Sequence, residues 1–163
     1  MIFKKHNSNL YNILLLLSRN IFFYKKIVLS DNFETRLYLI FIHFSILMII
    51  FKKKNSKFDQ KLYDSLFYNI ENNLRELGFG DVTVNKKMKI FNKILYDILL
   101  KIDNSEKNNF ELNHQLISSY FSVLNNEKDQ KYIEFKKYFD NFYDFCFALP
   151  LNSMINNISK FKY

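Results

Sequence analysis

Hydrophobic residues recur every three or four positions along most of this chain, which is the spacing of an amphipathic α-helix. The pattern is clearest on either side of a short polar stretch near residue 80. The positions are Phe58, Leu62, Leu66, Ile70, Leu74 and Leu77 before it, and Val84, Met88, Phe91, Leu95, Ile98 and Ile102 after it. We find no strand-like alternation and no internal repeat. The pattern therefore predicts an all-α protein, a single-domain helical bundle of about six helices.

Capping residues and apolar runs give the expected bounds of these helices. Asp31 and Glu34 have the spacing of a capping box before the most apolar run, and Ser56 with Asp59 has it before the third helix. Polar residues are expected to link the fourth, fifth and sixth helices. The predicted helices are 8–24, 37–51, 59–77, 84–102, 112–124 and 132–146, the linkers are 103–109 and 125–128, and Pro150 ends the sixth.

We divide the chain into an N-terminal basic extension (1–9), a helical domain (10–150) and a C-terminal tail (151–163). The tail is weakly helical in pattern and is expected to fray.

The turn near residue 80 contains both glycines of the chain, Gly78 and Gly80. Their closeness suggests a backbone that other residues could not form, and Gly78 suits the left-handed position that ends a helix. Asp81 or Thr83 would then accept the free N–H groups at the start of the next helix.

The charges before this turn also follow helix rules, with one exception. Arg75 suits the negative end of the helix dipole, and Glu71 is placed to pair with it. Glu76 lies at the unfavourable end, so it is either solvated or has another partner.

Composition supports helices with short connections. Of 163 residues 48% are hydrophobic and 18% aromatic, while two glycines and one proline leave little material for β-turns or phosphate-binding loops. The single cysteine, Cys146, excludes an internal disulfide framework and is most simply a core residue. The net charge of +8 is compatible with nucleic acid, an anionic membrane surface, an acidic partner or merely a solvated lysine-rich surface.

Two segments raise the question of a membrane. Residues 1–30 contain no acid, but they lack a small-residue cleavage site, so we expect a mature helix near a membrane rather than a signal or transit peptide. The apolar run 37–51 is shorter than the roughly 20 residues that a bilayer requires. It favours a buried central helix over a transmembrane span.

The sequence offers no catalytic residues. His6, His43 and His114 lie far apart, without other ligands at metal-binding spacing, and no phosphate loop or nucleophile elbow occurs. We therefore predict no enzyme activity, no metal, no cofactor and no small-molecule substrate. Arg36 and His43 share the face of an apolar helix and need partners, for which Asp31, Glu76 and Asp81 are candidates. The resulting cluster would be either a structural ion-pair group or part of a partner-binding surface.

The order of several short motifs resembles the ubiquinol–cytochrome c chaperone family, in its short bacterial form. The most specific is Leu74-Arg-Glu-Leu-Gly-Phe-Gly-Asp81, followed by Lys86-Lys-Met88. The others are Ser18-Arg-Asn-Ile-Phe-Phe-Tyr24, Ser30-Asp31, Arg36, Ile42-His43, Leu66-Phe67, Val84 and Tyr96. The resemblance covers residues 10 to about 150. The glycine and proline usual in the family before the second helix are absent from the segment Ile27–Asp31.

This resemblance implies an assembly chaperone of the respiratory cytochrome bc1 complex. Relatives bind newly made cytochrome b near the ribosome and work with a small helper protein. By analogy we expect contact with cytochrome b or a bc1 assembly intermediate in the bacterial cytoplasm, peripheral to the inner membrane, or alternatively on the matrix side in mitochondria. A nucleic-acid-binding module and a membrane-associated structural protein remain the alternatives. The candidate binding or structural residues are Arg19, Tyr24, Asp31, Arg36, His43, Arg75, Glu76, Gly78, Gly80 and Asp81.

Overall fold

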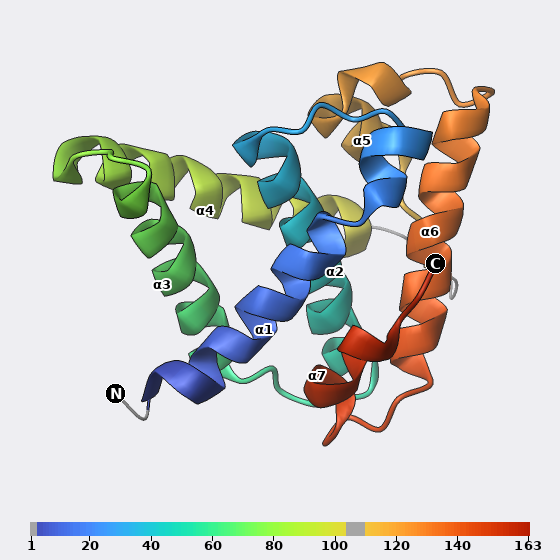
Figure 1. Cartoon of the computed structure of the whole chain (residues 1–163). Helices are drawn as coiled ribbons and strands as arrows, with labels where there is room; N and C mark the ends of the chain where they lie inside the picture. Colours follow the sequence, from blue (N-terminus) through green and yellow to red (C-terminus); the bar gives the residue numbers. More distant parts are fainter. Residues whose placement is uncertain (1–2, 104–109) are drawn as a thin grey trace.

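The computed structural model describes residues 3–103 and 110–163, and every regular element in these ranges is a helix (Figure 1). This confirms the predicted all-α class. The α-helices are α1 (Phe3–Ser18), α2 (Phe33–Lys53), α3 (Gln60–Glu76), α4 (Asp81–Asp103), α5 (His114–Tyr120), α6 (Gln130–Phe147) and α7 (Met154–Asn157). Shorter turns are the π-helix η1 (Phe22–Lys26) and the 3₁₀ turns η2 (Ser122–Leu124) and η3 (Ile158–Lys160). The linker predicted over 103–109 lies almost wholly outside the described residues.

Helix α2 is the centre of the bundle. It contacts α1, α4 and α6, and α1 also packs along α3 (Figure 1). Its 21 residues are long and apolar enough to cross a membrane, so length alone does not distinguish a core helix from a transmembrane span. However, 67% of its most apolar 18-residue window is buried by the protein itself. Burial therefore supports the prediction of a central core helix.

The first predicted helix is divided in two. Helix α1 ends at Ser18, and Tyr24 belongs to the separate turn η1. The side-chain oxygen of Asn20 accepts a hydrogen bond from the N–H of Phe22 (3.0 Å), which starts a new turn. The hydroxyl of Tyr24 donates to the carbonyl of Ser18 (2.7 Å). These two bonds satisfy backbone groups at the break and hold Arg19 in the bend between the two helical pieces.

The cap of α2 differs by one residue from the predicted capping box. Asn32, not Asp31, is the N-cap, and its side chain accepts from the N–H of Thr35 (2.9 Å). Asn caps a helix about as well as Asp, so Asp31 is free to pair with Arg36 instead.

The remaining helix starts also shift. Asp59 alone caps α3, through the N–H of Lys61, without Ser56. Helix α4 begins at Asp81, three positions before the predicted Val84, and Val84 donates to the carbonyl of Gly80 (2.9 Å). Helix α5 is shorter than the predicted fifth helix, because its backbone breaks at Phe121 before η2.

The segment 151–163 belongs to the core, so the prediction that it frays was wrong. Met154 and Ile158 are fully buried. The Phe161 ring lies against Tyr138 and Phe142, at centroid distances of 5.5 and 5.2 Å. The apolar pattern of the tail was too short to reveal that α6 provides a complementary aromatic face.

Candidate functional site

The polar residues singled out from the sequence do not form one cluster. Arg36 pairs with Asp31 (3.2 Å), whereas Arg75 pairs with Glu71 (3.0 Å) and with Asp81. His43 lies elsewhere, inside the core. Of the three candidate acids, Asp31 is the partner of Arg36, whereas Asp81 pairs with Arg75 and none of the three pairs with His43. The hypothesis of a single ion-pair group that includes His43 is therefore wrong. The Glu71–Arg75 pair is the one predicted from helical spacing.

His43 is a structural core residue. Its Nδ1 lies 2.6 Å from the carbonyl oxygen of Leu39, which can only accept, so Nδ1 carries the proton and donates. Its Nε2 then accepts from the hydroxyl of Tyr138 (2.9 Å). Complete burial lowers the pKa of the imidazole to about 4, and the Leu39 hydrogen bond offsets this only in part. His43 is thus neutral and fully satisfied, with no free atom for a ligand.

Arg19 and Arg36 do come together, at a pocket between α1, α2 and the end of α3. We call it the Arg19–Arg36 pocket, and its volume is about 180 Å³. Its lining residues are Tyr11, Leu15, Arg19, Phe33, Arg36, Leu37, Ile40, Ile70, Asn73 and Leu77. Arg19 comes from the bend after α1 and Arg36 from α2, and apolar side chains make up most of the remaining wall. The pocket therefore combines an apolar interior with positive charge.

The polar groups at this pocket are close enough to shift the pKa of the Tyr11 hydroxyl. Asn73 donates to the hydroxyl of Tyr11 (3.2 Å). Burial raises the pKa of Tyr11, while Asn73 and the charges of Arg19 and Arg36 oppose that shift. The charge of Glu76 raises the pKa of Tyr11, whereas the charges of the two arginines lower it. Glu76 is exposed, and no hydrogen bond or ion pair joins its side chain to another residue that the structure describes.

Tyr24 and Asp31 belong to the same neighbourhood. Burial raises the pKa of Tyr24 to about 12, with the charge of Asp31 raising it further and those of Arg36 and Arg19 lowering it. Asp31 neutralises part of the Arg36 charge. The guanidinium of Arg19, by contrast, makes no hydrogen bond or ion pair within the described part of the chain. Of the two arginines at this pocket, Arg19 is thus the one whose charge is available to a partner.

The turn between α3 and α4 borders the pocket through Leu77. Gly78 has a φ of +95°, the left-handed conformation predicted for it, whereas Gly80 does not adopt a left-handed φ. Asp81 pairs with Arg75 across the turn. Apolar side chains are exposed at this turn, among them Leu77 (57% exposed) and Val82 (70% exposed). The turn lies at the outer end of the α3–α4 hairpin (Figure 1).

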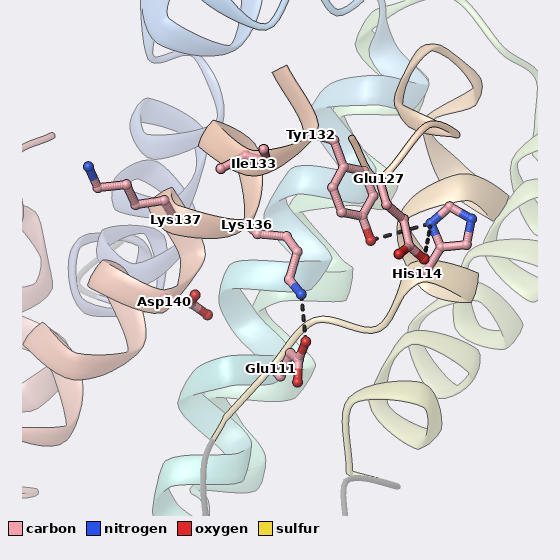
Figure 2. A pocket seen from close by; sticks show the side chains of 8 residues that line it. All are labelled: Glu111, His114, Glu127, Tyr132, Ile133, Lys136, Lys137 and Asp140. Atoms are coloured by element: carbon pink, nitrogen blue, oxygen red, sulfur yellow. Dashed lines mark hydrogen bonds and ion pairs between the residues drawn. The ribbon is translucent and has the colours of Figure 1, made fainter. Parts of the chain in front are cut away.

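A larger cleft of about 520 Å³, between α6 and the segment around α5, is polar (Figure 2). Two pairs of its side chains contact each other: Lys136 with Glu111 (2.6 Å), and His114 with Glu127 (3.3 Å). Burial raises the pKa of Asp140, whose Oδ1 has no hydrogen-bond partner. Over residues 3–103 and 110–163, no group of three or more His, Cys, Asp or Glu side chains could hold a metal ion. The cleft shows no arrangement of nucleophile, base and orienting group.

Sequence reasoning found the two arginines of the pocket but missed Tyr11, Asn73 and Leu77. A usable signal was present, because Tyr11, Leu15 and Arg19 follow one another at intervals of four on a single helical face. What the pattern could not reveal is that this face meets Asn73 of α3.

A comparison with protein families matches residues 25–118, more than half of this chain, to the family described as Ubiquinol-cytochrome C chaperone. The chain belongs to the ubiquinol–cytochrome c chaperone family. No curated protein and no solved structure matches it. The matched part of this chaperone includes Asp31, Arg36, His43 and the α3–α4 turn, whereas Arg19 and Tyr24 precede it.

Membership gives the protein a chaperone role connected with ubiquinol–cytochrome c reductase, and with it an expected protein partner in bc1 assembly. For such a chaperone the relevant features are surfaces that can hold another polypeptide. The Arg19–Arg36 pocket is the candidate that combines an open apolar interior with an available charge.

Proposed function

We propose that this chaperone binds newly made cytochrome b, or a bc1 assembly intermediate containing it, by protein–protein contacts. Family membership supports the chaperone role, and the Arg19–Arg36 pocket is the structural observation that carries the proposed mode of binding. We place the protein in the bacterial cytoplasm at the inner membrane, with the ribosome and a small helper protein as further partners. The net charge of +8 would favour an anionic membrane surface.

The size of the pocket favours a polypeptide over a cofactor. Sites for drug-sized molecules and cofactors usually have about 300–1,000 Å³. This pocket has about 180 Å³, closer to the roughly 150 Å³ cavity that accepts benzene. It would therefore take one bulky apolar side chain of a client. Arg19 would then pair with an acidic group next to that anchor, because charge-assisted hydrogen bonds to carboxylates are the strong ones.

Depletion of the protein in its host tests the proposed client. We expect selective loss of b-type haem in reduced-minus-oxidised membrane spectra, and loss of the assembled bc1 band on native gels, with terminal oxidases intact. Normal bc1 levels after depletion would overturn the proposal. Salt-sensitive binding to RNA or DNA would then support the nucleic-acid alternative, which the net charge favours.

Complementation with charge variants tests the pocket itself. Arg19→Glu should leave folding intact, because the guanidinium has no partner to lose, yet lower cytochrome b capture by about tenfold or more, as expected for a central anchor. Capture is measured by co-purification of cytochrome b with the tagged full-length chain, alongside the spectra. Lys61→Glu on α3 is the matched control, since it makes the same charge change at an exposed position outside the pocket. Equal capture by both variants would show that the pocket is not the client site.

A further inference from the structure

The outward face of α4 presents a straight stripe of exposed residues, which other helices border only at its C-terminal end, where Tyr96 reaches Tyr63 of α3. Its members follow one another at alternating intervals of four and three, the spacing at which a helix packs against another helix. The stripe, which we call the α4 outer stripe, consists of Val82, Lys86, Lys89, Lys93, Tyr96 and Leu100. The opposite face of α4, including Val84, Phe91 and Leu95, is buried in the bundle. Packing within this chain therefore uses only one of the two faces.

The α4 outer stripe is apolar at its ends and basic in its centre. Val82, Tyr96 and Leu100 are 70%, 57% and 68% exposed. Lys86, Lys89 and Lys93 are also exposed, and no hydrogen bond or ion pair joins their side chains to another described residue. The acids of α4 on either side of these lysines are already paired, Asp81 with Arg75 and Asp97 with Lys101 (2.8 Å). The positive charge of the stripe centre is therefore uncompensated by α4.

A groove continues the stripe at its C-terminal end. It has a volume of about 320 Å³ and lies between α4 and the end of α2. Its residues are Met48, Ile49, Lys52, Ser56, Phe58, Tyr96, Leu99 and Leu100. Tyr96 and Leu100 belong to both features, so the groove and the stripe form one surface.

We propose that this surface docks an amphipathic helix of a partner protein, with acidic residues at its centre and large apolar residues at its ends. The partner's carboxylates would face Lys86, Lys89 and Lys93, and its C- or N-terminal apolar residue would enter the groove. From Val82 to Leu100 the stripe extends about 27 Å at the rise of an α-helix, enough for about five turns of the partner.

The position of the lysines decides between this partner and a bilayer. A helix lying in a membrane interface has apolar residues along the centre of its outward face and lysines at the polar flanks. Here three lysines, Lys86, Lys89 and Lys93, lie on the centre line itself. A nucleic acid would use the lysines but would gain nothing from the apolar groove or from Val82. An acidic helix satisfies both parts of the surface.

A designed peptide tests the proposal with the full-length chain. The probe is a fluorescent 21-residue helical peptide carrying glutamates at three central seam positions and leucines at both ends. We expect saturable binding that weakens at least about fivefold in the triple variant Lys86→Glu, Lys89→Glu, Lys93→Glu, since exposed pairs contribute modestly and three are lost. That variant should instead prefer a peptide with lysines at the three positions.

The control is the triple variant Lys25→Glu, Lys57→Glu, Lys61→Glu, which has the same net charge and also changes exposed residues. Circular dichroism melts confirm that both variants fold. Absence of peptide binding, or equal weakening in both variants, would overturn the proposal. Binding to phosphatidylglycerol vesicles or to RNA that depends on Lys86, Lys89 and Lys93, without peptide binding, would also overturn it. Because no cytochrome b enters the assay, its result is independent of the proposed client.

Discussion

The buried imidazole of His43 makes the stability of this protein depend on pH. A group whose pKa is lowered on folding takes up a proton more readily in the unfolded chain, so the fold gains stability above the unfolded pKa. For His43 this stability is complete above about pH 6.5 and is lost as the pH falls from 6.5 towards 4. The difference between those values corresponds to about 3 kcal/mol.

We therefore predict that His43→Gln flattens the fall in unfolding free energy between pH 7 and pH 4.5. The half-buried His114 gives the comparison variant, His114→Gln, which also removes one imidazole but leaves the buried His43 in place. Urea denaturation at a series of pH values measures both. An unchanged slope in His43→Gln would contradict the neutral, buried state of this side chain.

The two glycines of the α3–α4 turn are predicted to differ in importance. Gly78→Val should lower the unfolding free energy by about 1–3 kcal/mol, because a β-branched residue resists a φ of +95°. No atom lies within 4 Å of a Cβ built on either glycine, so the cost is conformational rather than a clash. Gly80→Ala, at an ordinary φ, is the control and should be nearly neutral. Thermal melts in which both variants are equally stable would contradict this account.

Val28 allows the opposite substitution, from a β-branched residue to glycine. Its φ of 63° places a β-branched residue in the left-handed region. Val28→Gly should raise the unfolding free energy by about 1 kcal/mol, the relief of strain exceeding the extra freedom of glycine in the unfolded chain. Val123→Gly, at another exposed valine with no positive φ, should not stabilise. Chemical denaturation distinguishes the two.

At the scale of elements, periodicity predicted which helices exist but not how each begins. Helices α3, α4 and α6 could be read from their apolar faces because those faces are long. The ends depend on single hydrogen bonds, and adjacent residues such as Asp31 and Asn32 cap equally well, so only their other partners decide. In this case the ion pair with Arg36 occupies Asp31.

The division of the first predicted helix shows a second limit. The apolar pattern continues from α1 into η1, and nothing in the periodicity marks a break at Arg19. The break depends on the Tyr24 hydroxyl reaching the Ser18 carbonyl, six residues away. The candidate pocket was consequently only half predictable, since it is this bend that brings Arg19 beside Arg36.

At the scale of the molecule, aromatic rings join parts that are distant in sequence. The Phe22 ring lies 4.8 Å from that of Tyr163 and 5.5 Å from that of Tyr138, measured between centroids. The Tyr163 hydroxyl donates to Glu134 (3.1 Å). Segment η1 and residue Tyr163 are thus packed together against α6.

We predict that removing residues 161–163 lowers the unfolding free energy by about 1–3 kcal/mol, since each lost aromatic pair contributes about 0.5–1.5 kcal/mol. Calorimetry of the shortened protein measures the effect. Lys162→Ala is the control, because Lys162 is exposed and its loss removes no ring. A melting temperature unchanged by the truncation would mean that 161–163 is the fraying tail expected from the sequence.

The contact between Phe22 and Tyr163 can form only late in the synthesis of the chain. The ribosome adds Tyr163, whose ring covers Phe22, almost a whole chain length after Phe22. At elongation rates of about 5–20 residues per second this delay is roughly 10–30 s. During that interval the nascent chain exposes the aromatic face of η1. The core of this chaperone is therefore incomplete until residues 161–163 have emerged from the ribosome.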